Sequence, residues 1–101
     1  MSQFLRPLEL TPPKVIEGTT SDTAGEPTSV TIDGIVFDMV IINKSIDYSL
    51  YVSFDFGNTY IEIPPDSALP ILFGSFANPL ILIKSDGASQ PYKIIYRLRL
   101  S

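Results

Sequence analysis

The chain has 101 residues, of which 45% are hydrophobic and only 18% are charged, with a formal net charge of −4 and neither cysteine nor histidine. These absences exclude disulfides, cysteine-type zinc sites and a serine–histidine triad, and the acidic balance disfavours nucleic-acid binding, which requires a basic face. One domain of this length buries about 60–65% of its unfolded surface, and the low charge favours assembly with further copies or with a partner.

No apolar run follows a basic N-terminal region, and no stretch reaches about 18 apolar residues. We therefore expect neither a signal peptide nor a membrane span. The Asn43-Lys44-Ser45 sequon is then expected to carry no glycan.

Residues 1–28 are expected to form an extended arm in front of a domain at residues 29–101. The arm holds four of the nine prolines and the polar run Gly18–Glu26. Proline fixes φ and lacks an N–H donor, so the arm cannot be a helix or a central strand, and one short strand is expected around Lys14–Glu17. The arm is either a disordered terminus or a segment that orders on its own domain or on a neighbour. The residues expected to make that contact are Phe4, Leu5, Arg6, Leu8, Leu10, Val15 and Ile16.

The Asp33-Gly34 turn separates a short strand at Ser29–Ile32 from a longer one at Ile35–Asn43. The longer strand is apolar on both faces, so it is either covered twice or shared between the core and an interface. Alternation places Ile35, Phe37, Met39 and Ile41 on one face, and Val36, Asp38, Val40 and Ile42 on the other.

Leu50–Ile63 predicts a β-hairpin, because two alternating runs flank a Gly57-Asn58 pair that tolerates positive φ. The expected register pairs Phe56 with Thr59, Phe54 with Ile61 and Val52 with Ile63. The inner face would then hold Val52, Phe54, Phe56, Ile61 and Ile63, and the outer face Tyr51, Ser53, Asp55, Tyr60 and Glu62.

Three more strands are expected: an edge strand at Leu69–Phe73, then Leu80–Lys84 and Tyr92–Leu100. In the last, Tyr92, Ile94, Tyr96, Leu98 and Leu100 should face inward. No window has helical periodicity. Seven or eight short strands between turn signals predict an all-β fold, a single antiparallel β-sandwich that is jelly-roll-like, with the extended Pro-rich arm at its N-terminus.

Catalysis has little to draw on in this sequence. Asp55 and Glu62 form the one carboxylate pair whose geometry can be argued, as in glycoside hydrolysis, but acids on an open strand face are usually solvated. The loop carboxylates could bind calcium, yet none lies in a calcium-loop pattern and turn chemistry explains them; they are Asp33, Asp47, Asp66 and Asp86. We expect no enzyme activity and no catalytic, cofactor or metal site.

Tyr51 and Tyr60 are expected on the outer face of the hairpin. Tyrosines on a sandwich face can stack on sugar rings, which is the basis of a lectin-like alternative, with or without calcium. A second sheet packed over that face, or a subunit interface, would also explain them and is the favoured interpretation.

Asn43–Pro65 carries the runs IINKS, LYVSFD and YIEIPP, followed by LPILF and LILIKSDGASQPYKIIY. In order and texture, about residues 40–97 resemble small β-sandwich virion structural proteins of tailed bacteriophages. The resemblance implies a capsid decoration or cement protein, or a head-fibre base, often trimeric and gripping the capsid through an extended arm. It would be located in the virion after synthesis in the host cytoplasm. No functional residue is carried over, because such proteins have no catalytic motif.

On this resemblance, we expect a non-enzymatic structural protein that decorates or stabilises a phage capsid. It would form a homo-oligomer, with a trimer favoured, through the outer surface of Ile35–Ile42, and would hold a capsid or other virion protein through its arm. No nucleic-acid or membrane partner is expected. The alternative is a carbohydrate-binding β-sandwich, and a secretion or toxin accessory domain is a third reading.

Overall fold

Strands are the regular elements of residues 8–100, which are the part of the chain that the computed structural model describes. Apolar and polar side chains alternate with period two, which favours extended backbone over helix. In chain order the strands are β1 (Lys14–Thr19), β2 (Thr28–Thr31), β3 (Ile35–Asn43), β4 (Leu50–Ser53), β5 (Ile61–Ile63), β6 (Ala68–Ala77), β7 (Leu80–Ser85) and β8 (Pro91–Leu98).

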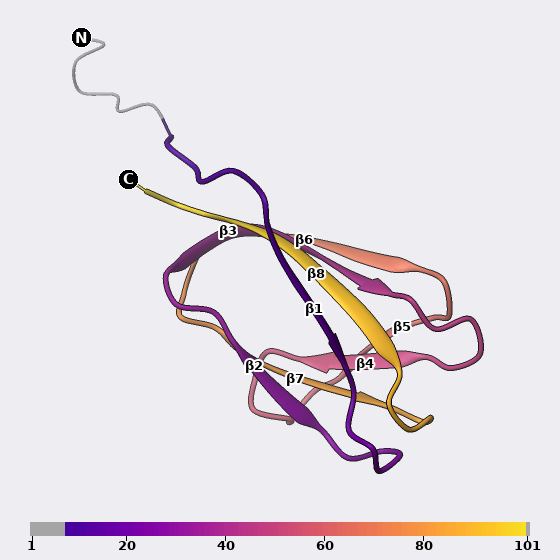
Figure 1. Cartoon of the computed structure of the whole chain (residues 1–101). Helices are drawn as coiled ribbons and strands as arrows, with labels where there is room; N and C mark the ends of the chain where they lie inside the picture. Colours follow the sequence, from indigo (N-terminus) through magenta and orange to yellow (C-terminus); the bar gives the residue numbers. More distant parts are fainter. Residues whose placement is uncertain (1–7, 101) are drawn as a thin grey trace, which may run out of the picture.

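The strands form two four-stranded antiparallel sheets, ordered β1-β8-β3-β6 and β2-β7-β4-β5 (Figure 1). Each strand of the first half of the chain pairs with one strand of the second half, and the order of the partners is reversed: β1 with β8, β2 with β7, β3 with β6 and β4 with β5. The chain is therefore one long hairpin, with its turn between β4 and β5, wound into two layers, which is the topology of a jelly roll. The predicted all-β, jelly-roll-like sandwich is confirmed.

The core lies between the inward faces of the two sheets. Val36 and Ile41 of β3, Ile81 and Ile83 of β7, and Ile94 of β8 are 0% exposed. Full burial of such a side chain stabilises the fold by roughly 1.5–3 kcal/mol. These contacts come from strands far apart in the sequence, so the core forms only when the whole hairpin has wound up.

Three phenylalanine rings join the sheets beside this core. Phe54, directly after β4, meets Phe73 of β6 edge to face with ring centroids 5.4 Å apart, and Phe73 meets Phe76 at 5.1 Å. Aromatic pairs in this arrangement contribute about 0.5–1.5 kcal/mol beyond their burial. Phe54 therefore packs against the core, as predicted.

The faces predicted for Ile35–Asn43 are wrong at the start of β3. Ile35 is 42% exposed, whereas Val36 is fully buried together with Met39 and Ile41. The cause is a β-bulge between Val36 and Asp38, because the pairing with β8 advances from Leu98 to Arg97 over those two residues. The extra residue, Phe37, reverses the alternation on its N-terminal side.

The tight turn predicted at Gly57-Asn58 is also wrong. β4 ends at Ser53, β5 begins at Ile61, and Val52 pairs with Ile61 rather than with Ile63. The register differs by two residues, which keeps the alternation along each strand. Two predicted positions are nevertheless wrong: Ile61, predicted for the inner face, is 42% exposed, and Ser53, predicted for the outer face, is 0% exposed. Phe56 lies in the loop at φ 61° with 76% of its surface exposed, so it does not belong to the core.

Polar side chains hold this longer loop closed. The Ser53 hydroxyl accepts hydrogen bonds from the N–H groups of Asp55 (3.3 Å) and Gly57 (2.9 Å). The Asp55 carboxylate accepts from the Ser53 hydroxyl (2.7 Å) and from the N–H of Thr59 (2.9 Å). Local side-chain bonds of this kind compete with the strand ladder, and here they end it before the Gly-Asn pair.

Part of the segment interpreted as an arm belongs to the sandwich. The short strand predicted around Lys14–Glu17 is present as β1, which lies at the sheet edge and pairs with β8 from Lys14–Tyr96 to Thr19–Pro91. Proline excludes the segment from the middle of a sheet but not from its edge. The sandwich therefore starts at Lys14 rather than at residue 29, and residues 20–27 form the connection from β1 to β2.

Candidate functional site

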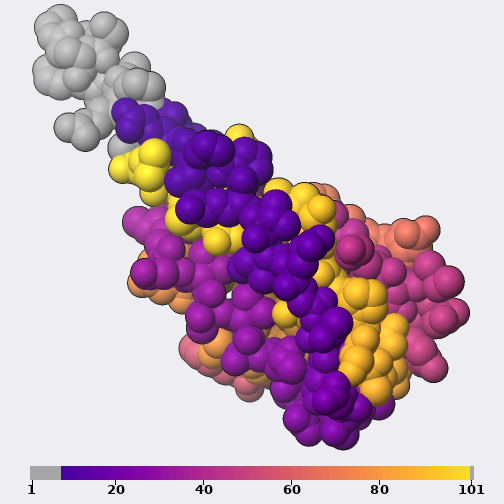
Figure 2. All heavy atoms as spheres, in the orientation of Figure 1, coloured from indigo at the N-terminus to yellow at the C-terminus, as the bar shows by residue number. Residues whose placement is uncertain are grey.

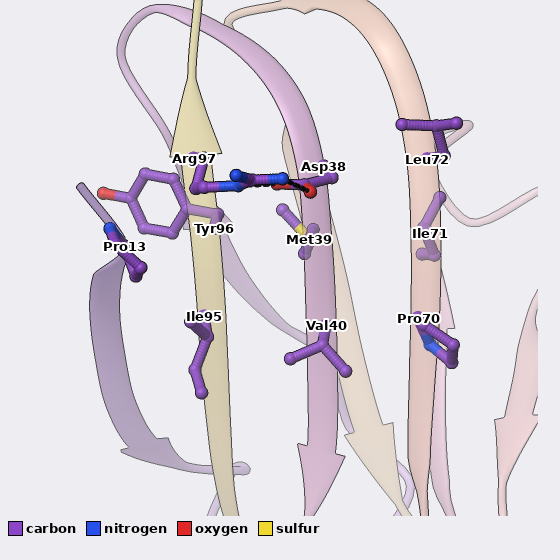
Figure 3. Close-up of a pocket in the computed structure, with 10 residues that line it drawn as sticks. All are labelled: Pro13, Asp38, Met39, Val40, Pro70, Ile71, Leu72, Ile95, Tyr96 and Arg97. Carbon is purple, nitrogen blue, oxygen red and sulfur yellow. Dashed lines mark hydrogen bonds and ion pairs between the residues drawn. The ribbon is translucent and has the colours of Figure 1, made fainter. Parts of the chain in front are cut away.

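An apolar row crosses the outer face of the β1-β8-β3-β6 sheet. Cross-strand pairing places Val15 beside Ile95, Ile95 beside Val40, and Val40 beside Pro70. We call these four residues the outer row; Figure 3 shows Ile95, Val40 and Pro70 side by side on β8, β3 and β6. Val15 is 54% exposed. The sheet thus presents apolar side chains to solvent from all four of its strands.

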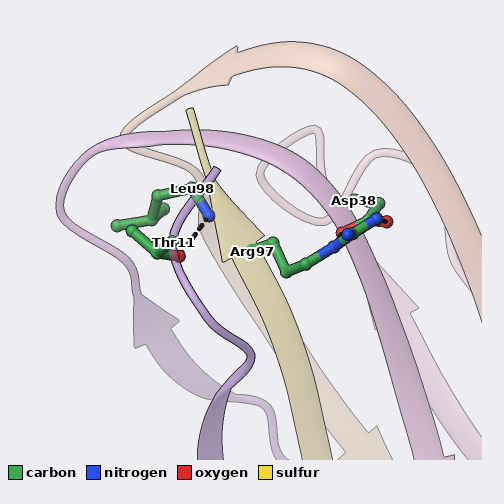
Figure 4. Close-up of polar contacts among 4 residues, drawn as sticks. All are labelled: Thr11, Asp38, Arg97 and Leu98. Carbon is green, nitrogen blue, oxygen red and sulfur yellow. Dashed lines mark hydrogen bonds and ion pairs between the residues drawn. The ribbon is translucent and has the colours of Figure 1, made fainter. Parts of the chain in front are cut away.

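An ion pair stands next to the outer row, one pleat away. Arg97 Nε donates to Asp38 Oδ1 at 2.9 Å, and Arg97 Nη2 donates to Asp38 Oδ2 (Figure 4). The hydrogen bonds from Arg97 lower the pKa of Asp38, and the carboxylate in turn raises the pKa of Arg97. The two side chains remain 29% and 40% exposed, respectively. Each charge therefore has its partner within the chain and still faces outward.

A shallow depression of about 460 Å³ lies between the outer row and the ion pair. Pro13 borders it at the β1 side and Leu72, 73% exposed, at the β6 side (Figure 3). The depression is open and apolar apart from the ion pair and the Tyr96 hydroxyl, and it lacks the enclosing polar groups that orient a small ligand. Its shape suits a broad contact with another protein surface.

Charged residues flank the other side of the outer row. Glu17 of β1 lies 3.8 Å from both the Lys93 and the Lys44 ammonium groups. Across the sheet, Lys93 is the cross-strand neighbour of Ile42 of β3, and Ile42 is the neighbour of Ala68 of β6. The outer face is therefore an apolar stripe between two charged edges.

The part of the predicted arm before β1 runs beside the end of the chain. Leu10 bridges to Arg99, the N–H of Thr11 donates to the Leu98 carbonyl at 2.9 Å, and the N–H of Leu98 donates to the Thr11 hydroxyl at 3.0 Å (Figure 4). The N–H of Leu100 donates to the Glu9 carbonyl at 2.8 Å. Figure 2 shows the indigo and yellow segments leaving the body together.

This two-stranded extension, residues 8–13 with 98–100, exposes apolar side chains. Leu8 is 48% exposed and Leu100 is 63% exposed. Leu100 was predicted to face inward, but it lies beyond the end of β8 and outside the core. Phe4, Leu5 and Arg6, which were predicted as contact residues, lie outside the described residues.

The other predicted contact residues fall on different surfaces. Val15 belongs to the outer row, whereas Ile16 is partly buried and packs against the core. The alternation along β1 separates these two neighbours. Tyr51 and Tyr60 lie on the opposite side of the molecule, with the β2-β7-β4-β5 sheet.

Both tyrosines already have partners. The Tyr51 hydroxyl donates to Asp86 Oδ2 at 3.2 Å, and partial burial together with that carboxylate raises the pKa of Tyr51. The Lys84 ammonium lies 4.2 Å from the Tyr60 ring centroid. A sugar ring stacking on this face of Tyr60 would have to displace Lys84.

The carboxylate pair considered for catalysis is occupied by structural bonds. Asp55 is held within its loop, where the bonds from Ser53 and Thr59 lower its pKa. Glu62 accepts a 2.6 Å bond from the Ser49 hydroxyl. Within residues 8–100, no group of three or more His, Cys, Asp or Glu residues could hold a metal ion. The same residues contain no helix long and apolar enough to cross a membrane.

The sequence does not predict that the four residues of the outer row lie together. The apolar residues on both faces of Ile35–Ile42 indicated only that β3 is either covered on both faces or shared between the core and an interface. Pro70 and Ile95 join Val40 only through pairings between distant strands. Comparisons of the chain with protein-family models, with curated proteins and with solved structures gave no match.

Proposed function

We propose that the protein is a non-enzymatic structural component of a phage virion that decorates or stabilises the capsid. The two-stranded extension (residues 8–13 with 98–100) would contact the capsid, and the outer face of the β1-β8-β3-β6 sheet would contact further copies. The phage-protein resemblance implies this role, the virion location and a homo-oligomer with a trimer favoured. The observation that supports it best is the paired extension, with the exposed leucines Leu8 and Leu100.

The extension is suited to contact a partner because it exposes apolar side chains and because backbone hydrogen bonds fix its conformation. An apolar segment without fixed structure must lose conformational entropy when it binds. Hydrogen bonds from the N–H groups of Thr11 and Leu100 hold residues 9–11 against residues 98–100 in the free chain. The exposed leucines can therefore be buried at a lower entropic cost.

The sheet edges are poorly suited to the same task. β5 has only three residues and β2 only four. β6 carries Pro70, which has no N–H to donate, and β1 is preceded by Pro12-Pro13. Short strands and prolines at edges prevent pairing with further strands. Assembly by addition of strands is thus disfavoured, and the faces and the extension are left as contact surfaces.

Purified virions of the phage that encodes the chain provide the test. We expect the protein in the particles by mass spectrometry and on the capsid by cryo-electron microscopy. Leu8→Asp combined with Leu100→Asp should weaken co-sedimentation with capsids by about tenfold or more, because two apolar contacts would be replaced by charges. Ile46→Asp, at a residue 77% exposed in another loop, is the matched control. Absence from virions, or unchanged binding of the double variant, contradicts the proposal.

The carbohydrate-binding alternative is less well supported, because Lys84 lies against the Tyr60 ring. A glycan array probed with and without calcium tests it. We expect no binding in either condition. Glycan binding that is lost in Tyr51→Ala and Tyr60→Ala would favour the alternative.

A further inference from the structure

We infer that two copies of this chain pack face to face through the β1-β8-β3-β6 sheets, about a two-fold axis parallel to the strands between β8 and β3. The inference deepens the self-association in the proposed function and rests on that part of it. It identifies the contact surface, the symmetry and the residues that meet. A two-fold contact also differs from the trimer that the resemblance implies, so the two can be distinguished.

The symmetry follows from the sheet order. β8 and β3 are the two central strands and β1 and β6 are the two edges, so a central two-fold axis places β8 over β3 of the second copy and β1 over its β6. Such a contact uses the same patch on both copies and closes after two subunits. Packed sheets keep their strand directions within about 30°, which a two-fold axis along the strands satisfies.

Apolar residues meet apolar residues in this arrangement. Ile95 and Val40 are cross-strand neighbours, so the axis brings Ile95 of one copy over Val40 of the second. Val15 comes over Pro70 in the same way. The outer row is thereby buried against itself.

The charges of the Asp38–Arg97 rung are complementary as well, whereas the Glu17–Lys93 rung comes over Ala68 and Ile42 of the second copy. Asp38 and Arg97 are opposite one another on β3 and β8, at the same level of the sheet. The axis therefore places Arg97 over Asp38 of the second copy, and Asp38 over its Arg97. Their partial exposure, 29% for Asp38 and 40% for Arg97, is on the outward face where the second copy would lie. The two ion pairs would form a ring of four alternating charges.

The face is large enough for a specific contact. Its four strands have 6–10 residues each. With strands about 4.8 Å apart and a rise of about 3.3 Å per residue, the footprint is about 500 Å² per copy and about 1,000 Å² for the pair. This reaches the roughly 1,000 Å² that a biological interface requires, and projecting side chains such as Leu72 add to it.

Charge-swapped full-length variants test this pairing by sedimentation velocity at tens of micromolar. Asp38→Arg alone places arginine over arginine, and Arg97→Asp alone places aspartate over aspartate, so each should raise the dimer dissociation constant by about tenfold or more. An equimolar mixture should form a heterodimer, because both cross-copy contacts become attractive again. Glu62→Arg, the same kind of charge change on the other sheet, should leave the dimer unchanged.

Circular dichroism melting verifies that each variant is folded. If a charge variant fails to fold, Val40→Glu, with Thr31→Glu as its control on the opposite sheet, tests the same face. A wild-type monomer overturns the inference and the self-association. A wild-type trimer, or dimers that persist in the single variants, overturns the two-fold contact alone. Capsid binding by the extension is measured separately and does not depend on this result.

Discussion

Asn43 shows how one side chain connects three parts of the chain at the end of β3. It is 1% exposed, and its Nδ2 donates to the carbonyl oxygens of Tyr48 (2.9 Å), Ile63 (3.0 Å) and Pro64 (3.1 Å). Its Oδ1 accepts from the N–H of Ser45 at 2.9 Å. The nitrogen that a glycan would require is thus buried and bonded, which gives a physical reason to expect no glycan at this sequon.

Substitution of Asn43 should be strongly destabilising. Asn43→Asp replaces the donor by an acceptor among three carbonyls, and we expect a loss of about 2–4 kcal/mol in the free energy of unfolding. Urea denaturation measures it. Asn58→Ala removes a comparable bond, from Asn58 Nδ2 to the Asp55 carbonyl, at an exposed position, and should cost less than about 1 kcal/mol. Equal effects of the two changes would contradict the structural role of Asn43.

The Asp38 carboxylate should contribute a pH-dependent part of the stability. Its pKa in the folded chain is lowered by Arg97, whereas an unfolded aspartate has a pKa of about 3.9. The contribution is fully present above that value and is lost as the pH falls through the folded pKa. The stability difference between wild type and Asp38→Asn should therefore be largest near neutral pH and shrink below about pH 4. Denaturation across pH measures it, and a difference that stays constant down to pH 2 would contradict the assignment.

The loop between β4 and β5 shows what local sequence could and could not predict. Alternation correctly predicts that strands flank it, but not the burial of Ser53 or the exposure of Ile61. The Gly57-Asn58 pair wrongly predicts a two-residue turn. The Ser53 and Asp55 side chains form hydrogen bonds within the loop, and the pairing of the two strands ends before the Gly-Asn pair. The residue types at Gly57-Asn58 indicate a preference for a tight turn. They do not indicate that side-chain bonds from Ser53 and Asp55 compete with that turn and close a longer loop instead.

Ser53 should be the residue on which this loop depends. Ser53 is 0% exposed, and Ser53→Ala leaves two N–H groups without their acceptor, so we expect a loss of about 1–3 kcal/mol. Phe56→Gly should instead be neutral or stabilising, by up to about 1 kcal/mol, because glycine adopts the positive φ without strain. Thermal denaturation distinguishes them. A stable Ser53→Ala variant, or a strongly destabilised Phe56→Gly variant, would show that other contacts hold the loop.

The pairing of β1 with β8 gives a prediction for truncation. Deleting residues 1–20 removes all of β1 and uncovers β8, so the melting temperature should fall by roughly 8–16 °C or more, the equivalent of about 2 kcal/mol. Leu8→Asp combined with Leu100→Asp changes exposed side chains outside the sandwich and should shift it little. Loss of capsid binding after the long deletion would therefore combine removal of residues 8–13 with a weakened sandwich, so the point variants are the proper probe. An unchanged melting temperature after the deletion would mean that β1 contributes little.

At the scale of the whole molecule, composition and alternation predict the class of fold but not its surfaces. The two-layer β architecture follows from strand spacing and turn signals. The outer row does not, because Val15, Ile95, Val40 and Pro70 come together only through pairings between distant strands and past a bulge at Phe37. The sparse charge of the chain, 18%, is the one feature of composition that favours an interface on some face.

The molar mass of the wild-type chain in solution is the most direct test of an account in which function lies in surface contacts. The chain has a mass of 11.1 kDa, and sedimentation equilibrium at tens of micromolar should give about 22 kDa, the value for a two-fold dimer. Val40→Glu should return the mass to that of one chain. A wild-type protein that sediments as a monomer throughout this range would contradict the account.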